Sequence, residues 1–121
     1  MSVLDASAVL AFLNDEPGSS VVESALDSGA VISAANWSEV AQKVTAAGSD
    51  WIESSALLDN YDVAIEVVGR ADAESAAAMW HPGAGLSLAD RLCITLGRRL
   101  ERRTLTCDSA WGEEGLIVQI R

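Results

Sequence analysis

Residues 2–13 read SVLDASAVLAFL, and this stretch sets the pattern for the rest of the chain. A short apolar strand, Val3–Leu4, stops at Asp5, and a helical pattern then continues to Leu13 before a Pro-Gly pair ends it. A strand that passes through one acidic residue into a helix is typical of the first unit of a parallel α/β fold, because parallel strands are joined by helical crossovers.

Strand and helix candidates alternate along the remaining sequence. Short apolar or alternating runs predict strands, and apolar residues spaced three or four apart predict helices. The expected further strands are 30–32, 62–67, 104–106 and 116–118, and the expected further helices are 19–28, 36–47, 50–60, 70–80 and 87–102. This order predicts a three-layer α/β/α domain, in which helices cover both faces of a central parallel sheet of about five short strands.

Length and composition limit what the chain can be. Its 121 residues suit one compact domain, which we expect to span 1–121, and the 50% hydrophobic content argues against disorder. No apolar run could span a bilayer and the start lacks the basic segment of a signal peptide, so we expect a cytoplasmic protein without membrane contact. The single His81 with Cys93 and Cys107 is too small a set for a zinc site, and we expect both cysteines to be buried thiols.

The net charge of −10 at pH 7 argues against a general nucleic-acid binder. The basic residues are unevenly placed, with one lysine in the whole chain and four arginines close together: Arg98, Arg99, Arg102 and Arg103. A polyanionic substrate would have to be met by this arginine cluster or by a partner chain. Alternatively, the cluster is only a solvated helix end, where the helix dipole favours cations.

Four acidic residues are expected near one edge of the sheet. Asp5 follows the first strand and Asp108 follows the fourth, and the carboxyl ends of parallel strands share one edge, where ligands bind in such folds. Asp90, in the first turn of the helix 87–102, and Glu39, in the helix after the second strand, belong near the same edge. Converging carboxylates suit Mg²⁺ or Mn²⁺. Without a cation they should repel one another, which raises some pKa values, so Asp108→Asn should stabilise the metal-free protein.

Each of these acids also has a structural interpretation. Asp5 and Asp108 can act as helix N-caps, and Ser87 with Asp90 fits the capping box Ser-x-x-acid. Glu39 falls nearly opposite the apolar stripe of its helix, which favours a solvated position. Capping and metal binding are compatible, because a helix N-terminus keeps a carboxylate ionised.

Other chemistries lack the residues that they need. Gly83-x-Gly85 follows a predicted helix and lacks the third glycine of a dinucleotide-binding loop, and no Gly-Lys-Ser/Thr phosphate loop is present. Serine–histidine catalysis would depend on His81 alone, which lies in a His-Pro-Gly-Ala-Gly loop. The acidic residues are therefore the main candidates for chemistry.

Four segments of the chain resemble the motifs of PIN domains. They are Val3-Leu4-Asp5-Ala6-Ser7-Ala8, Asn36-Trp37-Ser38-Glu39-Val40, Leu86-Ser87-Leu88-Ala89-Asp90-Arg91-Leu92-Cys93 and Leu105-Thr106-Cys107-Asp108-Ser109-Ala110-Trp111. Their order, their spacing and the total length are similar to VapC-type toxins of bacterial toxin–antitoxin pairs. The resemblance covers essentially the whole chain.

The resemblance implies the toxin of a type II toxin–antitoxin pair, a Mg²⁺- or Mn²⁺-dependent endoribonuclease that is usually a homodimer and is neutralised by an antitoxin. Asp5, Asp90 and Asp108 would be the metal ligands, Glu39 would complete the catalytic quartet, and Ser7 could support Asp5. A bound cation would activate a water for attack on the RNA phosphate, which leaves a 5′-phosphate and a 3′-hydroxyl.

The acidic charge balance departs from what an RNA-binding enzyme needs, and it leaves the RNA-binding surface undetermined. Two alternatives therefore stay open beside the toxin. One is a PIN-like module that binds a partner without catalysis, and the other is a flap-type DNA nuclease, although such enzymes carry additional DNA-binding elements.

Overall fold

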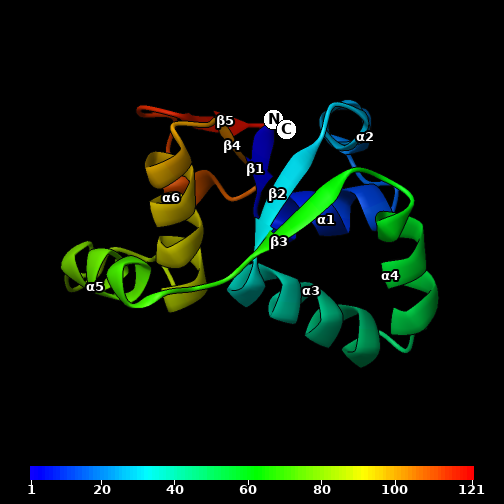
Figure 1. Cartoon of the computed structure of the whole chain (residues 1–121), viewed down its shortest axis with the longest axis horizontal. Helices are drawn as coiled ribbons and strands as arrows, with labels where there is room; N and C mark the ends of the chain where they lie inside the picture. Colours follow the sequence, from blue (N-terminus) through cyan, green and yellow to red (C-terminus); the bar gives the residue numbers. More distant parts are fainter.

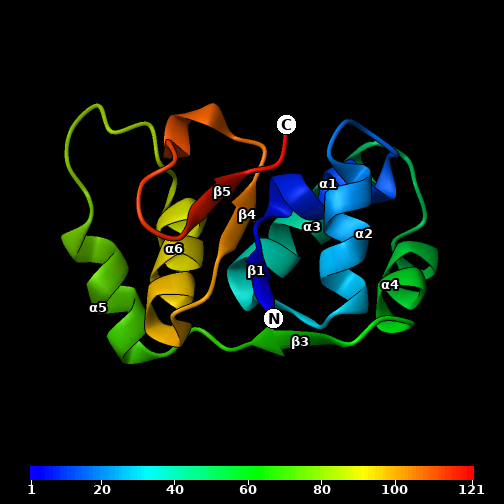
Figure 2. The same ribbon diagram turned by 90° about the horizontal axis from the view of Figure 1, so that it is seen from above.

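The computed structural model describes residues 1–121 and contains one five-stranded sheet with helices on both faces (Figures 1 and 2). The strands are β1 (Ser2–Leu4), β2 (Ala30–Ser33), β3 (Val63–Glu66), β4 (Thr104–Thr106) and β5 (Ile117–Gln119). All neighbouring strands are parallel, in the order β3-β2-β1-β4-β5. The predicted parallel α/β fold with five short strands is confirmed.

Six α-helices and one 3₁₀ turn connect the strands. They are α1 (Ala6–Leu13), α2 (Ser19–Asp27), α3 (Ala34–Ala46), α4 (Trp51–Asp59), α5 (Arg70–Ala78), α6 (Leu88–Leu100) and η1 (Ser109–Trp111). The predicted elements are all present, with ends close to the expected ones. Helix α3 begins earlier than expected because Ser33 ends β2 and caps α3 at once, its Oγ accepting a hydrogen bond from the Ala35 N–H at 3.3 Å.

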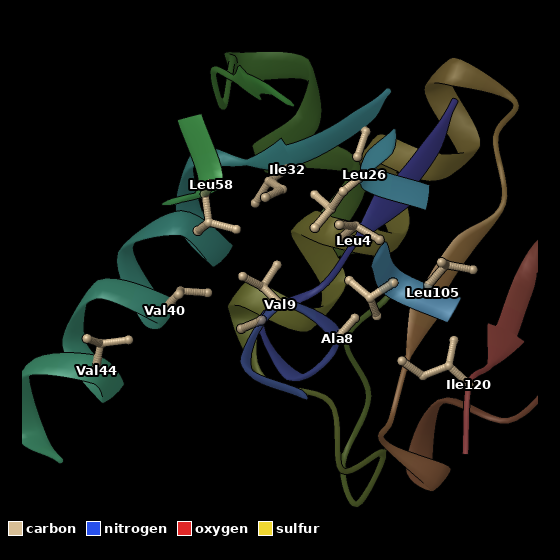
Figure 3. Packing of buried hydrophobic residues seen from close by; sticks show 13 residues of the cluster. Leu4, Ala8, Val9, Leu26, Ile32, Val40, Val44, Leu58, Leu105 and Ile120 are labelled. Atoms are coloured by element: carbon tan, nitrogen blue, oxygen red, sulfur yellow. The ribbon is translucent and has the colours of Figure 1, made fainter. Parts of the chain in front are cut away.

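Alternate residues of the strands pack against different helices, because successive side chains point to opposite faces of a sheet. Leu4 and Ile32 belong to the larger apolar cluster, which is shared with α1, α2, α3 and α4 (Figure 3). Val3 and Val31 pack instead with Ile94 and its neighbours on α6. Figure 1 shows the same division, with α1 to α4 on one side of the sheet and α5 and α6 on the other.

A glycine allows α6 to lie unusually close to β4. Gly97 is buried in the second half of α6, and a Cβ at this position would collide with the Thr104 hydroxyl at the start of β4. The contact places the last turns of α6 at the amino end of β4. The first turn of α6, which contains Asp90, therefore lies toward the carboxyl edge of the sheet.

The two cysteines are free thiols, with Cys93 buried in α6 and Cys107 half-buried after β4. No helix of the structure has the length and apolar character needed to cross a membrane.

Candidate active site

Asp5 lies at the carboxyl end of β1 and is only 3% exposed. It caps α1 as the sequence predicted, because its Oδ1 accepts a hydrogen bond from the Ala8 N–H at 2.8 Å. The Ser7 hydroxyl donates to the two carboxylate oxygens at 2.7 and 2.9 Å, and the Thr106 hydroxyl of β4 donates to Oδ2 at 2.6 Å. Hydrogen-bond donors from α1 and β4 therefore fix the carboxylate in one place.

Burial raises the pKa of Asp5 from 3.8 to about 6. The hydrogen bonds from Thr106, Ala8 and Ser7 lower it in part, and the nearby Asp90 carboxylate adds to the rise. The ion pairs of the structure all lie elsewhere, and none includes Asp5. A buried carboxylate is thus held in a defined position without a positive charge to match it.

Asp90 forms the expected capping box at the start of α6. Its Oδ2 accepts from the Ser87 N–H at 2.9 Å, and the Asp90 N–H donates to the Ser87 hydroxyl at 3.1 Å. The side chain is half-buried, and the capping box occupies one of its two oxygens. Its other oxygen makes no hydrogen bond, so capping leaves Asp90 with a donor atom to offer.

Glu39 is half-buried rather than solvated, because Asn36 connects it to α6. The Asn36 side chain is fully buried, and its Nδ2 donates to Glu39 Oε1 at 3.1 Å and to the Ala89 carbonyl at 3.4 Å. Both neighbours are acceptors, which fixes the orientation of the amide, and its Oδ1 is buried without a hydrogen-bond partner. Glu39 is therefore held beside the residue that precedes Asp90.

The pKa of the Cys93 thiol responds to the charges of three of the acids, Asp5, Asp90 and Glu39. The thiol lies on α6 close to Asp90, and burial raises its pKa well above the usual 9. The charges of Asp5, Asp90 and Glu39 raise the pKa further. Carboxylates from the end of β1, from α3 and from α6 thus act on one buried atom, and the structure brings these three to a common region.

Asp108 is joined to this group less directly. Its N–H donates to the Thr106 hydroxyl at 3.0 Å, so Thr106 links it to Asp5. Its half-buried carboxylate accepts from the Ala110 N–H at 2.9 Å and caps η1, which confirms the N-cap interpretation. The carboxylate does not contribute to the raised pKa of Asp5 or of Cys93.

The structure contains no group of three or more acidic, histidine or cysteine side chains close enough together to hold a metal ion. The donor set still has the chemistry of a site for a hard cation, since all the donors are carboxylate oxygens and Asp5 is buried without a counter-charge. Mg²⁺ and Mn²⁺ therefore fit these residues chemically.

The arginine cluster (Arg98, Arg99, Arg102, Arg103) lies away from the acids. Arg99 is nine residues after Asp90 on α6, which corresponds to roughly 13 Å along the helix axis. Arg99 also forms ion pairs with Asp72 at 3.0 Å and with Glu66 at 3.5 Å. Arg103 directly precedes β4, and its carbonyl accepts from the Val3 N–H at 2.8 Å, whereas Arg99 reaches the end of β3. The cluster thus lies at the end of α6 that is remote from Asp90.

Thr106 and Asn36 are site residues that sequence reasoning missed, whereas the expected support of Asp5 by Ser7 is present. Thr106 stands two residues before Asp108, and Asn36 stands three residues before Glu39, one turn away on the same helix. The sequence shows these spacings. The roles of Thr106 and Asn36, however, follow only from the pairing of β1 with β4 and the contact of α3 with α6.

The chain forms a parallel α/β domain with a buried carboxylate, Asp5, at the carboxyl end of its central strand. The family model for the PIN domain matches residues 2–113, so the chain belongs to the PIN-domain family. No curated protein sequence matches the chain.

Two solved structures share the fold. A toxin–antitoxin complex from Klebsiella pneumoniae is similar with a TM-score of 0.79 at 14% identity, over 100% of this chain and 98% of that chain. VapC20 of Mycobacterium tuberculosis, described as a sarcin–ricin loop cleaving toxin, has a TM-score of 0.74 at 14% identity, over 98% of this chain and 99% of that chain. At such low identity the likeness concerns the fold.

Proposed function

We propose that this chain is the toxin of a type II toxin–antitoxin pair and an endoribonuclease that depends on Mg²⁺ or Mn²⁺. The observation that carries the proposal is the buried Asp5 carboxylate, which is fixed by hydrogen bonds, lacks a counter-charge and lies near Asp90 and Glu39. Membership of the PIN-domain family and a fold shared with VapC20 support it.

In this proposal Asp5, Asp90 and Asp108 hold the cation, and Glu39 orients the attacking water. The bound cation supplies polarisation of the scissile phosphate and a more acidic water. The Ser7 and Thr106 hydroxyls keep Asp5 in place for its role. Asn36 holds the Glu39 carboxylate beside α6, where it can accept a proton or a hydrogen bond.

We further propose that residues 1–121 act as one PIN domain in the cytoplasm, as a homodimer, with RNA as substrate and a cognate antitoxin as protein partner. The likeness of the fold to the Klebsiella pneumoniae toxin–antitoxin complex supports an antitoxin.

RNA cleavage by the purified chain with Mg²⁺ or Mn²⁺ tests the activity. We expect products with a 5′-phosphate and a 3′-hydroxyl, loss of cleavage in EDTA, and a loss of at least about a hundredfold in Asp5→Asn. Asp5 would be a ligand of the cation that stabilises transition-state charge, and losing such stabilisation costs roughly this much. Asp59→Asn is the matched control, since it neutralises an exposed carboxylate at the end of α4. Calorimetry with Mn²⁺ gives a readout of binding that does not depend on cleavage.

Full cleavage in EDTA would overturn the metal mechanism. A protein that binds neither Mg²⁺ nor Mn²⁺ and cleaves no RNA would be a partner-binding module instead, and selective cleavage of DNA flaps would identify a DNA nuclease.

A further inference from the structure

The candidate site is acidic, yet its proposed substrate is a polyanion. Four of the eight basic residues form the arginine cluster at the end of α6 that is remote from Asp90. Lys43 lies in the last turn of α3, away from the edge where α3 begins, and Arg70 forms an ion pair with Glu74 at 3.0 Å. These six residues are remote from the site or already paired.

Arg91 and Arg121 are the two basic residues that remain. Arg91 follows Asp90, but its Nη1 donates to the Ala76 carbonyl at 2.9 Å and its Nε is buried, so it ties α6 to the end of α5. Arg121 is exposed and forms no ion pair in the structure. It is the one basic side chain without a fixed partner that can lie near the acids.

The course of β5 places Arg121 at the carboxyl edge of the sheet, where Figure 2 shows the chain leaving the tip of the strand. Thr106 pairs with Gln119, and the Ile120 N–H donates to the Thr106 carbonyl at 3.0 Å. The Gln119 side-chain amide also donates to the Asp108 carbonyl at 2.8 Å, so Arg121 follows two residues after a direct contact with Asp108. Ile120 fixes this segment, because its side chain is buried in the larger apolar cluster.

The charge of Arg121 reaches the flank of the site. Burial raises the pKa of the Cys107 thiol, and the Arg121 guanidinium opposes that rise. Cys107 is a direct neighbour of the site, since its N–H donates to the Ser7 hydroxyl at 2.9 Å and the same hydroxyl donates to Asp5. The guanidinium therefore acts electrostatically on a residue that is hydrogen-bonded to the network that holds Asp5.

We propose that Arg121 contacts a phosphate of the RNA backbone and holds the strand beside the acidic site. The inference rests on the proposed function. An arginine suits this role because its planar guanidinium can bind a phosphate through two hydrogen bonds. The surrounding acids repel a polyanion, so one unpaired cation at the site edge sets where the strand can approach.

Binding of a fluorescent single-stranded RNA in EDTA, followed by anisotropy from about 20 to about 200 mM KCl, tests the proposal without cleavage. Arg102→Gln is the matched control, since it removes the same charge from an exposed side chain of the arginine cluster. We expect Arg121→Gln to weaken binding roughly tenfold at low salt, which corresponds to one charge-assisted hydrogen bond. The slope of log affinity against log salt should flatten by about 0.7, the value for one phosphate contact on a single strand.

Arg121→Lys should recover only part of the affinity, because lysine keeps the charge but cannot make both hydrogen bonds. Both glutamine variants should melt like the wild type. Equal affinities and equal slopes for Arg121→Gln and Arg102→Gln would overturn the proposal, while RNA cleavage by the wild type would still support the nuclease. Wild-type protein that shows no salt-dependent RNA binding would overturn the role of Arg121, and absence of cleavage with Mg²⁺ or Mn²⁺ would separately overturn the proposed function.

Discussion

The two ends of α6 carry opposite charge and differ in how that charge is balanced. At the last turn, Arg99 is half-exposed and pairs with both Asp72 and Glu66. At the first turn, Asp90 lies near the buried Asp5, and no basic side chain pairs with either. Arg99 is thus paired with two acids at the exposed end, whereas the buried acid near the first turn has no counter-charge.

This difference indicates that the uncompensated charge near the first turn of α6 serves a purpose other than stability. Folding alone gives no reason to bury a carboxylate without a counter-charge, since the desolvation costs free energy. The hydrogen bonds from Ser7, Thr106 and the Ala8 N–H offset only part of that cost, because the pKa of Asp5 still rises to about 6. Three experiments test this difference between the two ends of α6.

The largest expected effect is a gain of stability in Asp5→Asn without metal. The pKa of Asp5 is about 6 in the folded protein and 3.8 as the ordinary value, so ionised Asp5 destabilises the fold by up to about 3 kcal/mol. The cost is absent below the unfolded pKa, grows as pH rises from about 4 to about 6, and is fully present above that. Chemical denaturation in metal-free buffer should show Asp5→Asn more stable than wild type near pH 8, and equal near pH 4.

Asp59→Asn serves as the control and should show no such gain at any pH, because that carboxylate is exposed. A constant difference between Asp5→Asn and wild type across this pH range would mean that burial of the charge is not the cause.

A smaller effect, in the opposite direction, is expected for Thr106→Val. The substitution keeps the shape but removes the hydroxyl that donates to Asp5 and accepts from the Asp108 N–H. We expect a loss of about 2 kcal/mol at neutral pH, because a hydrogen bond to a charged group is lost and a backbone donor loses its partner. The pKa of Asp5 should rise further, since the Thr106 bond lowers it.

Thr45→Val provides the comparison. Its hydroxyl donates to the Ala41 carbonyl on the exposed face of α3, and such a bond contributes little to stability. Urea unfolding of both valine variants gives the difference, and equal stability losses would show that the Thr106 hydroxyl does not support the buried charge.

The smallest effect is expected at the other end of α6. Arg99→Gln removes the ion pairs with Asp72 and Glu66, and we expect a loss of less than about 1 kcal/mol, because half-exposed pairs are screened by solvent. The loss should shrink further in about 0.5 M NaCl. A loss above about 2 kcal/mol that salt leaves unchanged would mean that both ends of α6 depend on specific charges.

The sequence predicted the sheet, the helices and the position of Asp5, because a strand end followed by a helix start is a local signal. It could not predict the role of Thr106, which depends on β4 lying beside β1, or of Asn36, which depends on α3 meeting α6 at Ala89. These contacts join segments that are 101 and 53 residues apart. Long-range packing determines these two contacts, and a local sequence pattern does not encode such packing.

The sequence did not distinguish the burial of Asp5 from that of Asp108, and repulsion among clustered carboxylates predicted that Asp108→Asn would stabilise the metal-free protein. The structure distinguishes them by burial. Asp5 is nearly inaccessible, whereas Asp108 is half-buried and caps η1. The expected stabilisation therefore moves from Asp108→Asn to Asp5→Asn, since only a buried charge has a large desolvation cost.

The hydrogen bond from Thr106 to Asp5 has a consequence for biosynthesis. Asp5 is synthesised 101 residues before Thr106, its donor in β4. A nascent chain that has not reached β4 therefore has an Asp5 with only its local donors, and the central strand lacks one of its two neighbours. Contacts of such long sequence separation form late in folding. The complete hydrogen-bond network of Asp5 consequently forms only after β4 has been synthesised, and a nascent chain that ends before β4 should not yet contain it.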